Sequence, residues 1–121
     1  MIDKIWGKDK ILIVEPPFYN LFGYKRYHYP ITPVLVATFL EEKGYKVKVY
    51  DMDKPRLDCR EYSRIECGQN YPRYEVELQN LSHPIWKELE EILRSFKPDV
   101  VGISVSVTAK NASAKIVAEL T

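Results

Sequence analysis

The sequence of 121 residues predicts an α/β domain built on a parallel sheet. Three short apolar segments, at residues 10–15, 46–51 and 99–105, have the length and composition of strands. Each is followed by a segment in which apolar residues recur at helical spacing. Strand and helix therefore alternate, which is typical of right-handed crossover units with helices on both faces of a sheet.

The first two strands differ in their expected surroundings. "KILIVE", at 10–15, is a continuous apolar run and predicts a strand buried on both faces. In the segment that follows, Thr32 is placed to cap a helix, Pro33 suits its first position, and Gly44 is the expected stop. "KVKVYD", at 46–51, alternates lysine and valine, which predicts a half-buried strand at a sheet edge.

A second helix is expected between residues 84 and 96. Ser82 or His83 caps it, Pro84 opens it and Pro98 ends it. Its apolar stripe consists of Ile85, Leu89, Ile92, Leu93 and Phe96.

The third strand, at 99–105, reads as fully buried, and a third helix follows from about Ala109. A fully buried strand has a neighbour on each side, and sheets of this class usually hold five or more strands. We therefore expect residues 1–121 to be part of a longer protein. Without those neighbours, the third strand would present an edge through which the chain could self-associate.

Residues 52–82 interrupt the regular pattern. Tyr74, Val76 and Leu78 alternate with charged residues, as in a strand, whereas Tyr74, Leu78 and Leu81 also fit one face of a helix. Periodicity does not decide between the two. Because long structureless loops are uncommon in compact domains, we expect partial order here.

Composition excludes several classes of protein. With 18 basic and 17 acidic residues, the net charge of +1 gives no electrostatic argument for nucleic acid or an anionic membrane. No apolar stretch approaches the roughly 18–20 residues that span a bilayer, and the amino terminus has no secretory pattern. We therefore expect a cytoplasmic protein, in which Cys59 and Cys67 are free thiols.

Hydroxyl side chains gather at the carboxyl end of the third strand. In parallel sheets, ligands bind outside the carboxyl ends of the strands. Ser104, Ser106 and Thr108 lie at this end, as do Asp51 and the loop after the first strand. Because an unsatisfied buried hydroxyl costs about 1–3 kcal/mol, we expect the three hydroxyls to face a ligand crevice. The alternative is that Thr108 or Ser106 caps the third helix.

The loop after the first strand, "EPPFYNLFGYKRYHYP", contains neither a dinucleotide-binding nor a phosphate-loop glycine pattern. Its aromatic and proline side chains suit a large flat ligand. Alternatively, the loop packs onto its own sheet. Glu15 lacks the acidic partner of a phosphoaspartate receiver, and with His28 and His83 as the only imidazoles we expect no catalytic constellation and no metal site.

Three quoted stretches together carry a resemblance. The strand ending in "EPP", then "YPITPVLVATFLEEKGYKVKVYDMD" and "FKPDVVGISVSVTAKNASAKI", resemble the amino-terminal cobalamin-binding domain of radical S-adenosylmethionine enzymes. That group includes methyltransferases and the anaerobic magnesium-protoporphyrin IX monomethyl ester cyclase. The match covers most of residues 10–51 and 84–118 and leaves 52–83 as a variable insertion. It implies a flavodoxin-like (Rossmann-like) three-layer domain, with strand order 2-1-3, truncated after the third strand–helix unit.

The resemblance also implies which residues meet the cofactor. Ser104 and Thr108 match a serine and a threonine that contact cobalamin in the family, whereas Ser106 stands where leucine is usual. The motif that supplies a histidine to cobalt is absent, so loop side chains are expected at the lower face. The implied cofactor-binding set is Ser104, Val105, Ser106, Thr108, Asp51, Pro17, Phe18, Tyr19 and Asn20.

The cysteine motif that holds the [4Fe–4S] cluster in this family is missing, so the cluster and S-adenosylmethionine are expected in a domain of the polypeptide outside residues 1–121. The resemblance thus implies that the domain binds and orients cobalamin beside that radical domain of the same polypeptide. One alternative is a ligand-free interaction module whose crevice is closed by the tyrosine-rich loop. Another, a nucleotide-sugar transferase half-domain, has no supporting carboxylate or phosphate loop.

Overall fold

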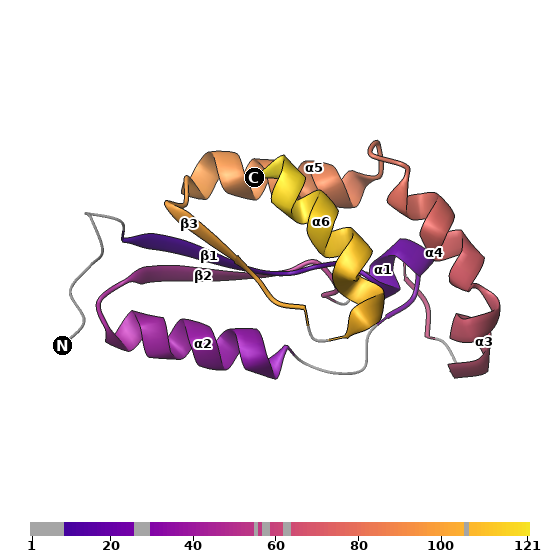
Figure 1. The fold of residues 1–121 in the computed structure, drawn as a ribbon, viewed down its shortest axis with the longest axis horizontal. Helices are drawn as coiled ribbons and strands as arrows, with labels where there is room; N and C mark the ends of the chain where they lie inside the picture. The colour runs from indigo at the N-terminus through magenta and orange to yellow at the C-terminus, as the bar shows by residue number, and fades with distance from the viewer. Residues whose placement is uncertain (1–8, 26–29, 55, 57–58, 62–63, 106) are drawn as a thin grey trace.

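The computed structural model describes residues 9–25, 30–54, 56, 59–61, 64–105 and 107–121 (Figure 1). Its sheet holds three parallel strands, β1 (Lys10–Glu15), β2 (Lys46–Asp51) and β3 (Val100–Ile103), in the order β2-β1-β3. The predicted α/β class and strand order are confirmed, and the arrangement is flavodoxin-like.

Helices cover both faces of the sheet, which gives three layers. Figure 1 shows α2 (Ile31–Glu42) on one face, with α5 (Pro84–Phe96) and α6 (Asn111–Leu120) on the other. Alternate β1 side chains supply the two cores. Ile11 and Ile13 pack on the α2 side, whereas Leu12 and Val14 enter the larger core beneath α5 and α6.

Of the two predictions made for the ends of α2, one is wrong and the other is confirmed. The helix begins at Ile31 after Pro30 and has no side-chain cap, so the predicted cap by Thr32 is wrong. At the other end, Gly44 adopts a left-handed φ of 95°, and Tyr45 N donates to Leu40 O at 3.2 Å. Tyr45 also packs beside Leu40, so the predicted stop at Gly44 is confirmed.

Helix α5 has the predicted cap and stripe. His83 Nδ1 accepts a hydrogen bond from Ile85 N at 3.2 Å, and Pro84 opens the helix. The apolar stripe faces the core, with Ile85 and Leu89 fully buried. Lys97 ends the helix in a left-handed conformation, immediately before Pro98.

The segment between β2 and α5 is helical. It forms α3 (Arg64–Gln69) and α4 (Tyr71–Leu78), which resolves the open choice between strand and helix. The Tyr74 hydroxyl is 2.7 Å from Ala109 O, to which it donates a hydrogen bond. Figure 1 places α3 and α4, with the short α1 (Tyr19–Phe22), beyond the carboxyl ends of the strands. The variable segment therefore covers part of the edge at which ligands bind in such sheets.

Strand β3 is shorter and more exposed than predicted. It spans Val100–Ile103 rather than 99–105, and Val100 is 44% exposed. The expectation of a fully buried strand is wrong for this structure, because no described strand pairs with the outer edge of β3. A 3₁₀ turn, η2 (Thr108–Lys110), leads into α6.

Among the residues that the structure describes, no helix has the length and hydropathy required to cross a membrane.

Replacing Leu89 by alanine should lower the free energy of unfolding by about 2–5 kcal/mol, because the fully buried side chain leaves a cavity between α5 and the sheet. Urea denaturation followed by circular dichroism measures the change. Leu81→Ala, at a side chain that is 60% exposed, is the control and should change stability by less than about 0.5 kcal/mol. Equal effects at the two positions would contradict the described core.

Candidate functional site

An apolar pocket of about 250 Å³ opens beside the carboxyl end of β3, next to the start of α2. Side chains alternate along β3, so Val101 and Ile103 pack toward the main core, while position 102 and Ser104 face the α2 side. The lining residues are Ile13, Thr32, Pro33, Val36, Gly102, Ile103 and Ser104.

The floor of this pocket depends on Gly102. A Cβ at this position would lie 2.9 Å from Ile13 Cδ1, closer than carbon atoms normally approach. Because glycine has no side chain, Ile13 can pack closely against the backbone of β3 at this position.

Ser104 lies at the rim of the pocket. Its backbone N donates to Val14 O at 2.9 Å, which holds the residue against β1. Its half-buried hydroxyl forms no hydrogen bond with any other described residue and is available to a ligand. Thr108 is exposed, and its hydroxyl also has no described partner, so this side chain does not cap the following helix. Ser106 lies outside the described residues, and Val105 is 46% exposed.

The loop after β1 packs onto its own sheet, which was the alternative to a ligand-binding loop in the sequence analysis. Pro17 and Phe18 are buried, and Phe18 contacts the rings of Tyr19, Phe22, Tyr71 and Tyr74. Asn20 is 4% exposed, and its Nδ2 donates to Met52 O and Lys54 O, both at 2.9 Å. Phe18 and Asn20, expected to meet a ligand, are thus occupied by internal contacts, while Tyr19 remains half-buried.

Asp51 is also engaged within the protein. Its Oδ1 accepts a hydrogen bond from Asp53 N at 3.0 Å and shapes the turn that follows β2. The structure thus brings Ser104 and the apolar pocket together, but it places Asp51 in a turn and the aromatic loop in the core.

A buried ion cluster, which the sequence did not predict, joins the ends of the three strands. Lys110 Nζ lies 2.5 Å from Glu15 Oε1 and 3.2 Å from Asp53 Oδ2. All three residues are at most 4% exposed. Glu15 ends β1, Asp53 follows β2 and Lys110 follows β3, so the cluster holds the η2 turn against the sheet.

The two carboxylates of the cluster are held differently. Lys110 donates its hydrogen bond to Glu15, whereas Asp53 Oδ2 receives no aligned hydrogen bond despite lying within ion-pair distance. Asp53 Oδ1 accepts from Phe18 N at 2.8 Å and Asn20 N at 3.1 Å. Burial raises the pKa of Asp53, because the opposing effects of the Lys110 ammonium and of these two backbone N–H groups are smaller.

The described residues contain no group of three or more His, Cys, Asp or Glu side chains arranged to hold a metal ion. Comparison of the chain with protein-family models, curated proteins and solved structures gave no match.

Asp53→Asn should remove a pH dependence of stability. A carboxyl whose folded pKa is raised stabilises the fold at low pH, and this stabilisation is lost as pH rises through the folded pKa. Asparagine keeps the Oδ1 acceptor and leaves Lys110 paired with Glu15. The wild-type protein should therefore gain stability relative to Asp53→Asn as pH falls.

Urea unfolding of the two proteins between pH 4 and pH 8 checks this prediction, and pairwise differences cancel the titration of all other groups. A wild-type protein that loses stability relative to Asp53→Asn as pH falls would show that Lys110, rather than burial, controls the Asp53 pKa.

Proposed function

We propose that this chain is part of the cobalamin-binding domain of a radical S-adenosylmethionine enzyme, a methyltransferase or an oxidative cyclase. The pocket between α2 and β3 would receive the aromatic base of the cofactor's nucleotide tail. The observation that carries the proposal is this pocket, with Gly102 at its floor and Ser104 at its rim.

The chemistry of the pocket fits such a base. A flat heterocycle needs broad apolar walls and a few polar groups that fix its orientation. Ile13, Pro33 and Val36 supply the walls, and the Ser104 hydroxyl can hydrogen-bond a polar edge. At about 250 Å³, the pocket is below the roughly 300–1,000 Å³ typical of sites for drug-sized ligands, so it suits the base and not the corrin ring.

The corrin macrocycle would contact other residues at the same end of the sheet. Val105 and Thr108 are both exposed there and are the available contacts. Phe18 and Asn20 are not proposed to contact cobalamin, because both are held in the interior. The domain would bind and orient cobalamin, which supplies methyl-transfer or redox chemistry, while the [4Fe–4S] cluster and S-adenosylmethionine would be held by the radical domain.

A second candidate function is a ligand-free interaction module. The observation in its favour is the aromatic cluster of α1 and α4, in which Phe18, Phe22 and Tyr74 fill space near the carboxyl ends of β1 and β2. On the α5 side, this cluster restricts a ligand's access to the carboxyl ends of the strands. It does not close the pocket beside α2.

Titration of the native enzyme with hydroxocobalamin, followed by absorbance and by quenching of tryptophan fluorescence, tests the proposal. Val36→Trp should weaken binding at least about tenfold because the larger ring fills the pocket mouth. Val34→Trp is the matched control, since Val34 lies on the same helix, is similarly exposed and does not line the pocket. Cobinamide, which lacks the nucleotide base, should bind both variants equally well.

Two outcomes would contradict the proposal. Saturable cobalamin binding that is equally strong in Val36→Trp and Val34→Trp would show that the base lies elsewhere. If the native protein does not bind cobalamin, the interaction module becomes the better interpretation.

A further inference from the structure

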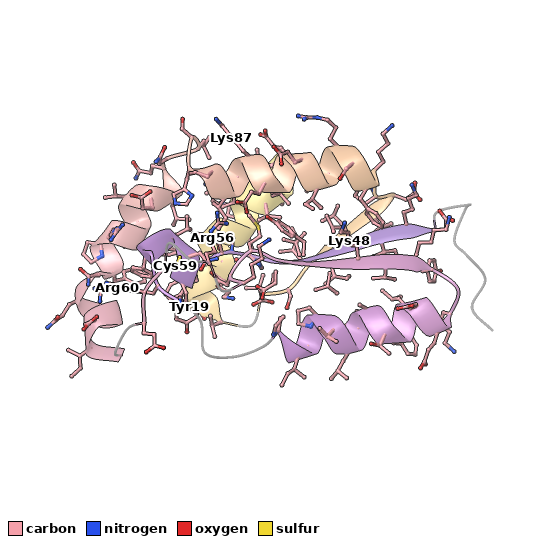
Figure 2. The ribbon with its side chains drawn as sticks, turned by 180° about the vertical axis from the view of Figure 1, so that it is seen from behind. Tyr19, Lys48, Arg56, Cys59, Arg60 and Lys87 are labelled. Carbon is pink, nitrogen blue, oxygen red and sulfur yellow. The ribbon has the colours of Figure 1, made fainter. Side chains whose placement is uncertain are left out.

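A second pocket, of about 210 Å³, lies among α1, α4, the segment after β2 and the start of α5. It shares no residue with the pocket beside β3. Its lining is mainly polar and includes Asn20, Arg56, Cys59, Arg73, Glu77 and His83. Figure 2 shows Arg56 and Cys59 at the end of the molecule where α1 and α4 meet.

Three of these polar side chains are held by internal contacts. Arg56 forms a bidentate pair with Glu88, with nitrogen–oxygen distances of 2.8 and 2.7 Å, which neutralises its charge. The Cys59 thiol donates to Asn20 Oδ1 at 3.6 Å, and Asn20 Nδ2 is bound to two backbone carbonyls. These three side chains are therefore held in place and offer little to the charged groups of a ligand.

Two further charged residues, Arg73 and Glu77, also line the pocket. They are four residues apart on α4, a spacing at which side chains can meet. Within the described part of the chain, neither side chain forms an ion pair or a hydrogen bond. Arg73 instead extends toward α1, where its Nη2 lies 3.8 Å from the position that a Cβ on Gly23 would take. A positive and a negative group thus line one small pocket separately.

His83 adds a donor. Because its Nδ1 accepts a hydrogen bond from Ile85 N, the ring nitrogen that can donate is Nε2. The ring also lines the pocket. The pocket therefore offers Arg73 and His83 as donors and Glu77 as an acceptor.

We propose that this pocket binds a small zwitterion that carries both a carboxylate and an ammonium group, of the α-amino acid class. The carboxylate would accept hydrogen bonds from Arg73 and His83, and the ammonium group would donate to Glu77. A simple anion would be repelled by Glu77, and a simple cation by Arg73. The volume of about 210 Å³ suits a ligand of few heavy atoms.

Amide chemical shifts of the complete chain, recorded during titration with glycine or L-alanine at constant ionic strength, test this inference. Both amino acids should cause saturable shifts at Gly23, Arg73 and His83, whereas acetate and methylammonium should not. Arg73→Gln and Glu77→Gln should each weaken amino acid binding at least about tenfold. Both residues lie at the surface of α4, so these changes should leave the fold intact.

Matched controls are Glu75→Gln, on the same helix but outside the pocket, and Arg94→Gln, exposed on α5. Both should bind the amino acids as the wild type does. If acetate binds and Glu77→Gln strengthens its binding, the pocket is an anion site and the inference is wrong. The absence of saturable shifts with glycine and L-alanine at tens of millimolar would also overturn it.

Discussion

The buried ammonium of Lys110, held between the carboxylates of Glu15 and Asp53, is the contact on which the functional end of the domain depends. It joins residues at or just after the carboxyl ends of all three strands. A buried charge that loses its partner costs several kcal/mol, so η2 cannot lift from the sheet without a large penalty. The segment that carries Ser104 and Thr108 is anchored by Lys110 at one end and by the pairing of β3 with β1 at the other.

The strand order decides which part of this edge can accept a ligand. On the α5 and α6 side, the aromatic residues of α1 and α4 fill the space beyond β1. On the other side, α2 packs against β2 and β1 and leaves the adjacent face of β3 uncovered. Gly102 lines this region and lets Ile13 pack against the backbone of β3. The same topology thus produces a closed aromatic half and an open apolar pocket.

Much of the fold could be predicted from local patterns. Apolar runs located the three strands, and Gly44 and His83 act locally, through a left-handed turn and a side-chain cap. The cap expected at Thr32 was wrong because the helix begins at Ile31, two residues before the start expected at Pro33. Residues 71–78 fit both strand and helix patterns, and the helix places Tyr74 in the core against Phe18.

The candidate site was less predictable because it depends on contacts between distant residues. Lys110 lies among small and polar residues, a pattern typical of an exposed position. Its burial depends on Glu15, which is 95 positions away in the sequence. Phe18 and Asn20 belong to a loop whose composition fits either a ligand site or a core, and only tertiary packing shows that they are buried. Ser104, by contrast, could be located because the change from apolar to hydroxyl side chains marks the carboxyl end of the third strand.

Isotope-edited nuclear Overhauser spectroscopy, with diamagnetic hydroxocobalamin bound to the labelled native protein, would test whether the cobalamin base enters the pocket over Gly102. If it does, cross-peaks are expected from the base protons to the Gly102 α-protons and the Val36 methyl groups. Bound cobalamin whose base contacts only the aromatic residues of α1 and α4 would contradict the account.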